Sequence, residues 1–211
     1  MADVIPTENE LYAALESRHG KAFQKKLSGA RVAVCGLGGL GSNIAICLAR
    51  AGVGTLHLID FDRVDLSNIG RQQFFLSQLG MNKTDALSET LRQINPYSRI
   101  ITDTLHLERG NIPKLISDAH IVCEAFDSPE CKAELVDTVI EVFPEKYIVS
   151  ASGMSGLHTA NSITTRKITP KFYLCGDGVS DVSNDHTLYA SRVMVCAAHQ
   201  ANAVLKIIME M

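Results

Sequence analysis

The chain has 211 residues, of which 46% are hydrophobic, so it can bury one sizeable core and has little left for a second. Its 20 basic and 23 acidic side chains give a net charge of −3, which argues against a strong general attraction to nucleic acid or to an anionic membrane. We therefore expect one domain over residues 1–211 that recognises its partners by specific contacts and binds neither nucleic acid nor membrane.

Two further features of the chain concern its compartment. Residues 1–23 lack the long apolar core of a secretory signal and the Arg- and Ser-rich character of a transit peptide, and no segment reaches about 18 consecutive apolar residues. We expect a soluble, cytoplasmic protein. The six cysteines include no Cys-x-x-Cys pair, so we expect neither a disulfide framework nor a zinc site.

The first half of the chain alternates strand and helix patterns. A polar leader, residues 1–30, is expected to be helical, and the apolar run 31–35 that follows is typical of a buried parallel strand. Residues 43–50 then predict a helix and 55–59 a second strand, which ends in a polar loop. A strongly periodic helix over 84–94 stops before an Asn-Pro pair.

The second half continues this pattern and then changes. We expect strands at 99–103, 120–123 and 147–150, and helices at 111–117 and 129–143. Such alternation predicts an α/β fold: a Rossmann-like, mostly parallel sheet with helices on both faces, its nucleotide-binding core spanning 31–150. The extension, 151–211, should hold an antiparallel strand within 157–166, a loop around 175–178 and a long helix over 189–210.

A glycine cluster directly follows the first predicted strand. Residues 36–41 satisfy G-x-G-x-x-G between a strand and a helix, so the bare backbone can approach phosphate oxygens at a helix N-terminus. Asp60 ends the second strand, nineteen residues after Gly41, where a carboxylate accepts hydrogen bonds from ribose hydroxyls. These features fit an NAD enzyme and an ATP enzyme equally well.

Three charged residues further along favour ATP. Arg71 and Lys83 lie twelve residues apart and can neutralise the additional phosphates of a nucleoside triphosphate. Asp127 follows the fourth strand at the carboxyl edge of the sheet, where it is a suitable Mg²⁺ ligand. Together with the glycines and Asp60, these residues predict a site for ATP and Mg²⁺.

The stretches GLGGLGSNIAICLARAGVGTLHLIDFDRVDLSNIGRQQF (residues 36–74), GMNK (80–83) and CEAFDSPE (123–130) resemble the ubiquitin-activating-type superfamily. Within it, the chain resembles the ThiF/MoeB/HesA adenylyltransferases, and most of all the short ThiF forms that act on the sulfur carrier ThiS in thiamine biosynthesis. The resemblance is clear over residues 28–165. It carries nucleotide contacts onto Gly39, Asp60, Asn68, Arg71, Lys83 and Asp127. The neighbours that complete the expected nucleotide site are Gly36, Gly38, Gly41, Asp62, Ser67, Gln72 and Ser128.

The resemblance also implies an activity and partners. It implies ATP-dependent adenylylation of the C-terminal Gly carboxylate of a small ubiquitin-like sulfur-carrier protein that ends in Gly-Gly. The family forms homodimers in which an N-terminal arginine reaches the ATP of the other subunit, and Arg18 is the candidate here. Relatives that bond covalently to the carrier use an accessible thiol, for which Cys175, expected in a glycine-containing loop, is the candidate.

Three alternatives stay open. The glycine motif also suits a nicotinamide-dependent oxidoreductase, although Arg71 and Lys83 speak against it. A non-catalytic scaffold would have little need of the complete set of charged residues. A dehydratase of the tRNA base threonylcarbamoyladenosine uses the same adenylation step, and the absence of a basic surplus weakens that alternative.

Overall fold

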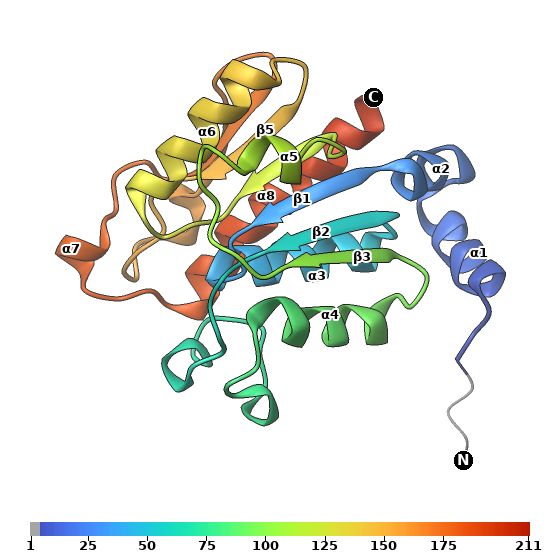
Figure 1. Ribbon diagram of the computed structural model, residues 1–211, viewed down its shortest axis with the longest axis horizontal. Helices are drawn as coiled ribbons and strands as arrows, with labels where there is room; N and C mark the ends of the chain where they lie inside the picture. Colours follow the sequence, from blue (N-terminus) through green and yellow to red (C-terminus); the bar gives the residue numbers. More distant parts are fainter. Residues whose placement is uncertain (1–4) are drawn as a thin grey trace.

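The computed structural model describes residues 5–211, which form a seven-stranded sheet covered by helices on both faces (Figure 1). The strand order is β3-β2-β1-β4-β5-β7-β6, and β6 alone among these strands runs antiparallel to its neighbour. The predicted fold class is therefore confirmed. The strands are β1 (Arg31–Cys35), β2 (Thr55–Ile59), β3 (Arg99–Asp103), β4 (Ile121–Glu124), β5 (Tyr147–Ala151), β6 (Thr164–Lys167) and β7 (Phe172–Gly176).

Apolar side chains on both faces explain why the central strands lie inside the molecule. Helices α3, α4 and α8 pack on one face over a core that includes Ile44, Leu87 and Val204. Helices α5 and α6 cover the other face over Ile112 and Leu135. The helices are α1 (Glu8–His19), α2 (Lys21–Gly29), α3 (Gly39–Ala51), α4 (Lys83–Ile94), α5 (Ile112–Leu115), α6 (Pro129–Val142), α7 (Val182–Asp185) and α8 (Ala190–Glu210), with short 3-10 turns η1 (Leu66–Asn68), η2 (Leu76–Gln78) and η3 (Ala160–Ser162).

The C-terminal extension differs from its prediction in two places. The antiparallel strand expected within 157–166 is confined to β6, because 160–162 form a 3-10 turn. The loop expected around 175–178 begins only at Asp177, since Cys175 and Gly176 belong to β7, which pairs in parallel with β5. Alternate burial of Tyr173 and Cys175 within a five-residue run produces this strand.

Helix α3 begins earlier than its side-chain pattern indicates. Its first turn, residues 39–42, contains two glycines and a serine, so the apolar period becomes visible only from about residue 43. The N-terminal segment is helical as expected from Glu8 onward, and Thr7 closes a capping box with Glu10. The predicted helical leader also includes residues 1–4, which lie outside the described residues.

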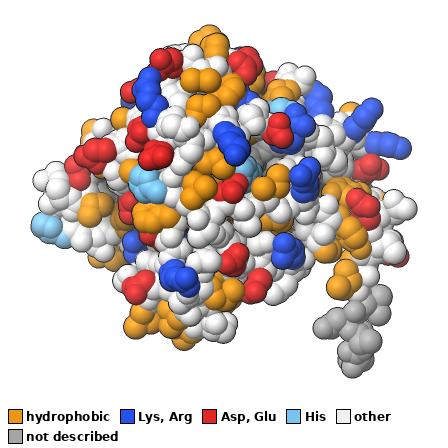
Figure 2. All heavy atoms as spheres, viewed as in Figure 1, with side chains coloured by type: hydrophobic (Ala, Val, Ile, Leu, Met, Phe, Trp, Pro, Cys, Tyr) orange, Lys and Arg blue, Asp and Glu red, His pale blue; other side chains and the backbone are white. Residues whose placement is uncertain are grey.

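Helices α1 and α2 lie beyond the ends at which the parallel strands begin, opposite the arrowheads in Figure 1. Figure 2 shows acidic and basic side chains mixed across the visible face, as the small net charge leads one to expect. Among residues 5–211, no helix combines the length and the apolar character needed to span a bilayer.

Candidate functional site

A cavity of about 370 Å³ opens at the carboxyl ends of the parallel strands. Its walls come from the loops that follow β1, β2, β3, β4 and β5, from the start of α6, from the segment before α8, and from the first turn of α8. This is the edge at which open α/β sheets bind their ligands. Of the predicted residues, the cavity is lined by Gly36, Gly38, Gly39, Asp60, Asp62, Arg71, Gln72, Lys83, Asp127 and Ser128.

The glycine turn forms the floor of the cavity and leads into α3. Gly36 has φ +88°, and a Cβ there would lie 2.8 Å from the carbonyl oxygen of Ala125, so only glycine fits without strain. Gly38 is the N-cap of α3, and no side chain caps that helix end. The positive end of the helix therefore faces the cavity, ready for an anion.

The last glycine of the motif has a different role. A Cβ on Gly41 would lie 1.8 Å from the carbonyl oxygen of Gly36, and Gly41 does not line the cavity. It allows α3 to pack against the turn and makes no contact with the space a ligand would fill.

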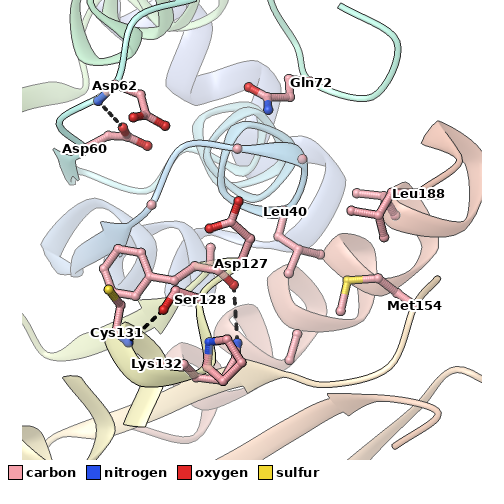
Figure 3. Close-up of a pocket in the computed structure, with 18 of the residues that line it drawn as sticks. Leu40, Asp60, Asp62, Gln72, Asp127, Ser128, Cys131, Lys132, Met154 and Leu188 are labelled. Carbon is pink, nitrogen blue, oxygen red and sulfur yellow. Dashed lines mark hydrogen bonds between the residues drawn. The ribbon is translucent and has the colours of Figure 1, made fainter. Parts of the chain in front are cut away.

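Asp60 links the end of β2 to the glycine turn. Its Oδ2 accepts a hydrogen bond from the backbone N–H of Leu37 at 2.6 Å, and its Oδ1 accepts one from the N–H of Asp62 at 2.7 Å (Figure 3). Burial raises the pKa of this carboxyl, against the opposing effect of the nearby Lys83 ammonium. Each oxygen keeps a lone pair for a further donor, such as a ribose hydroxyl.

Lys83 brings a buried positive charge to the cavity wall. It is the first residue of α4, is 5% exposed, and its Nζ donates to Oδ2 of Asp62 at 2.7 Å. Asp62 remains half-exposed, with 46% of its side chain accessible, so solvent weakens its hold on the ammonium. The pair therefore places a cation at the cavity that a phosphate can engage.

Arg71 and Gln72 enter the cavity from the segment after η1. Arg71 is half-buried as a residue, and its Nη1 donates to the carbonyl oxygen of Ser67 at 3.0 Å. Gln72 is 8% exposed, and among the described residues its Oε1 has no hydrogen-bond partner. Because a buried amide oxygen without a partner is costly, this atom points to a donor that a ligand would supply.

Asp127 and Ser128 occupy the loop between β4 and α6. Asp127 is exposed, and Figure 3 shows its carboxylate directed toward the glycine turn. The Ser128 side chain accepts from the N–H of Cys131 at 3.3 Å and so caps α6. This cap fixes the backbone next to Asp127, and therefore the position from which the Asp127 side chain extends into the cavity.

The combined donor set fits a nucleoside polyphosphate with a divalent cation. One ammonium, one guanidinium and an uncapped helix end can neutralise phosphate oxygens, while the Asp127 carboxylate is a hard oxygen ligand of the kind Mg²⁺ takes. Gln72 adds to this space a buried amide oxygen that is available to accept a hydrogen bond from a ligand.

Two predicted phosphate contacts lie outside the cavity lining. Ser67 and Asn68 belong to η1, where the Asp65 carboxylate accepts from Ser67 and the Asn68 Oδ1 accepts from the Asp65 N–H at 3.1 Å. Their side chains are engaged in this local cap, and only the backbone carbonyl of Ser67 contacts another predicted residue, Arg71. Their contact with phosphate stays a prediction.

The placement of Cys175 on an accessible loop is wrong. Cys175 lies within β7 with 0% exposure, and burial raises the pKa of its thiol. A thiol in that setting is a poor nucleophile. Arg18 is exposed near the end of α1, at the opposite edge of the sheet from the cavity, so its reach into a partner's site stays a prediction (Figure 1).

Several lining residues were not anticipated. His106 and Leu107 come from the loop after β3, Lys132 from α6, and Met154 and Leu188 from the extension, on the other side of the cavity from Asp60 (Figure 3). Position in a parallel sheet could have indicated the loop after β3, since it reaches the same edge. Nothing in the sequence marks the extension as part of the site.

The chain is similar to proteins of one known family. The model of the ThiF family matches residues 12–211. An adenylyltransferase and sulfurtransferase uba4 from Aspergillus terreus is 39% identical over 136 residues, which cover 64% of this chain and 28% of that protein. The UBA4 protein of Candida glabrata is 35% identical over 66% of this chain and 32% of its own length. The chain thus spans about a third or less of these curated relatives.

Solved structures share the fold over nearly the whole chain. The Escherichia coli tRNA N6-threonylcarbamoyladenosine dehydratase TcdA, in complex with AMP, superposes with a TM-score of 0.86 at 22% identity and covers 98% of both chains. MccB of Escherichia coli superposes with a TM-score of 0.72 at 24% identity, over 98% of this chain and 66% of MccB. The family match over residues 12–211 shows that this chain belongs to the ThiF family.

Proposed function

We propose that the protein binds ATP with Mg²⁺ and adenylylates the C-terminal glycine carboxylate of a small ubiquitin-like sulfur-carrier protein of the ThiS kind. One observation carries the proposal: Arg71, Lys83 and Asp127, from three separate segments, line one cavity above the glycine turn. A nicotinamide enzyme has no evident use for this charge set. The uba4 names of the relatives, which include adenylyltransferase, support the same reaction type.

The proposed reaction needs no covalent enzyme intermediate. An oxygen of the carrier's terminal carboxylate attacks the α-phosphorus of ATP in line, the bond to the bridging oxygen breaks, and pyrophosphate leaves with that electron pair. Lys83 and Arg71 neutralise the phosphate charge and hold the polyphosphate in one orientation, while Asp60 fixes the ribose. Bound Mg²⁺, held by Asp127, would supply further charge neutralisation.

The far side of the cavity suits the acyl partner. Gly153, Met154, Leu188 and Val193 line it with small or apolar groups. A glycine tail has no side chains, so the segment that leads to the terminal carboxylate would fit such a wall better than a tail with charged side chains would. This side of the cavity therefore supports a protein C-terminus as the second substrate.

The test is incubation with ATP, Mg²⁺ and purified carriers ending in Gly-Gly. We expect exchange of labelled pyrophosphate into ATP that depends on the carrier, and an added AMP on the carrier by intact-mass measurement. A carrier lacking its last glycine is the matched control and should give neither signal. If none of the tested carriers supports pyrophosphate exchange, and the protein binds NAD saturably, the proposal is contradicted.

A second candidate is the adenylation of a modified tRNA base. The mutual 98% coverage with TcdA at a TM-score of 0.86 favours this option, although 22% identity shows the fold alone. The same assay separates the two candidates when threonylcarbamoyladenosine-containing tRNA replaces the carrier. AMP release that depends on tRNA and not on carrier would select the dehydratase.

A further inference from the structure

A fully buried carboxylate lies directly beneath the loop that carries Asp127. Glu124 is the last residue of β4, and its side chain has 0% exposure. A buried charge of this kind is stable only when it is paired and hydrogen-bonded. Its partners therefore indicate what the carboxylate does.

The partners of Glu124 shape the start of the Asp127 loop. Its Oε1 accepts from the backbone N–H of Phe126 at 2.7 Å, and its Oε2 accepts from the Ser150 hydroxyl on the neighbouring strand. The carbonyl oxygen of Glu124 accepts from Gln200 of α8 at 3.0 Å. The residue immediately before Asp127 is thus tied to the end of β4 through the carboxylate.

Lys132 supplies the opposite charge from the second turn of α6. Its Nζ lies 2.5 Å from Oε2 of Glu124 and 3.5 Å from the carbonyl oxygen of Phe126, the contact drawn in Figure 3. Its side chain is 25% exposed and lines the cavity. One ammonium therefore neutralises the buried carboxylate and also holds the loop from its other side.

We propose that Glu124 and Lys132 are a pair of positioning residues that set the orientation of Asp127 toward Mg²⁺. This inference rests on the proposed function. Without the ammonium, the carboxylate of Glu124 would be an unpaired buried charge, which relaxes by rotation of the side chain or by local opening of the loop toward water. Either change weakens the hydrogen bond from the N–H of Phe126 to Glu124. The adjacent Asp127 side chain is then no longer held in one orientation.

The Glu124–Lys132 pair acts through Asp127, so its disruption should weaken nucleotide binding mainly when Mg²⁺ is present. Partners behind a metal ligand typically change metal affinity or activity by about 10- to 100-fold when they are removed. Lys132→Met should therefore weaken binding of Mg·ATP by roughly 10- to 100-fold, and should change binding of ATP in the presence of EDTA far less. Lys132→Arg, which keeps the charge, should retain most of the affinity.

The experiment combines calorimetric titration with hydrogen–deuterium exchange of the peptide spanning residues 122–130. We expect faster exchange of this loop in Lys132→Met and near wild-type exchange in Lys132→Arg. Glu124→Gln combined with Lys132→Met should recover part of the protection, because the glutamine oxygen can still accept from Phe126 and no charge is left unpaired. The double variant also serves where the single one fails to fold.

Lys146→Met is the matched control. Lys146 is also a buried lysine, 8% exposed, but its Nζ donates to backbone carbonyls at the other edge of the sheet. It should lower the melting temperature without changing loop exchange or the affinity for Mg·ATP.

Two outcomes distinguish failure of the positioning role from failure of the proposed function. Wild-type Mg·ATP affinity and loop exchange in folded Lys132→Met would overturn the positioning role, even though the proposed function stood. Loosened exchange in Lys132→Met, in a protein whose wild type binds no ATP, would overturn the proposed function and keep the pair as the element that orders the loop.

Discussion

Polar side chains at the amino edge of the sheet bond to the chain itself, whereas several at the carboxyl edge face the cavity. At the amino edge, Lys146 donates to the carbonyl oxygens of Ser117 and Ala119 at 2.7 and 2.6 Å, and the Nε of Arg31 donates to that of Asp118 at 2.7 Å. These contacts join the strand beginnings to the preceding turns. Here charge stabilises the chain itself.

At the carboxyl edge, polar groups remain available. Gln72 keeps an unpartnered oxygen within the described chain, Asp127 is exposed, and α3 begins without a side-chain cap. Folded proteins satisfy nearly all of their buried polar groups. Five buried side-chain atoms of residues 5–211 lack a partner, and among their residues only Gln72 lines the cavity, so its oxygen is the one that a ligand in the cavity can engage. Variants at this edge should alter ligand binding more than stability, and the four predictions below test that contrast.

Asp127→Ala should have the largest effect on activity. Loss of the proposed metal ligand should reduce carrier adenylation about 1,000-fold, equal to about 4 kcal/mol of transition-state stabilisation. Because Asp127 is exposed, the melting temperature should stay near that of the wild type. Pyrophosphate exchange and a thermal melt measure both quantities. Wild-type turnover in this variant would require another residue in the metal role.

Arg71→Ala should reduce the affinity for ATP by roughly 10- to 100-fold, the range for loss of a charge-assisted hydrogen bond to phosphate. Arg63→Ala is the matched control, because this exposed arginine of the same segment donates to the carbonyl oxygen of Gly80 at 2.7 Å and does not line the cavity. Calorimetric titration of each variant with Mg·ATP measures the difference. Equal losses in both variants would remove Arg71 from the phosphate site.

Asp60 should make nucleotide affinity depend on pH. Burial raises its pKa, so the folded protein keeps this proton to a higher pH than the unfolded chain does. Its contribution to stability is then fully present below the unfolded pKa and is lost as pH rises through the raised value. Ribose binding needs the ionised form, so affinity should rise over the same interval.

The check compares wild type with Asp60→Asn between about pH 4 and pH 6, near the ordinary range of carboxyl groups. The ratio of their affinities cancels the titration of the nucleotide itself, and we expect it to shrink as pH falls. A ratio that does not change with pH would show that Asp60 does not accept from the ligand in its ionised form.

Gln72→Leu should have the smallest effect, and it should separate binding from stability most sharply. The free energy of unfolding should change by no more than about 1 kcal/mol, because the substitution removes an oxygen that has no partner among residues 5–211. Affinity for Mg·ATP should fall by about fivefold, the value of roughly one hydrogen bond.

Gln78→Leu provides the control for Gln72. Gln78 is 6% exposed, its Nε2 donates to the carbonyl oxygen of Ala86 at 2.9 Å, and its Oε1 accepts from the N–H of Phe75 at 3.0 Å. Its loss should lower stability and leave nucleotide affinity unchanged. The reverse pattern in chemical denaturation and titration would contradict the assignment of Gln72 to the ligand.

Much of the fold follows from local sequence because each central strand carries apolar residues on both faces. Strand β1 was predicted with its observed bounds, and β2 and β3 likewise. Strand β7 was not predicted, since its alternation is short and its glycine end has the composition of a loop. Whether a five-residue segment pairs with β5 is decided by tertiary packing, which local patterns do not contain.

The site was predictable where a motif fixes a backbone shape. Glycines after β1 and acidic residues after β2 and β4 reach one edge because parallel strands end together. The Glu124–Lys132 pair was not predicted, because a buried charge becomes visible only when its partner's position is known. Cys175 was misplaced because the glycines and Asp177 that follow it have the composition of a loop, whereas its neighbours in space belong to the apolar core.

The contact between Gly41 and the carbonyl oxygen of Gly36 bears on how such motifs should be searched for. A pattern that admits alanine at the final position also retrieves chains whose helix stands farther from the turn, because a methyl group has no room at 1.8 Å. Position 38 has room for alanine, because a Cβ there would meet only the Gln72 amide, at 3.7 Å. Three identical letters in one pattern thus carry unequal information, and a scoring scheme for this turn should weight the last glycine above the middle one.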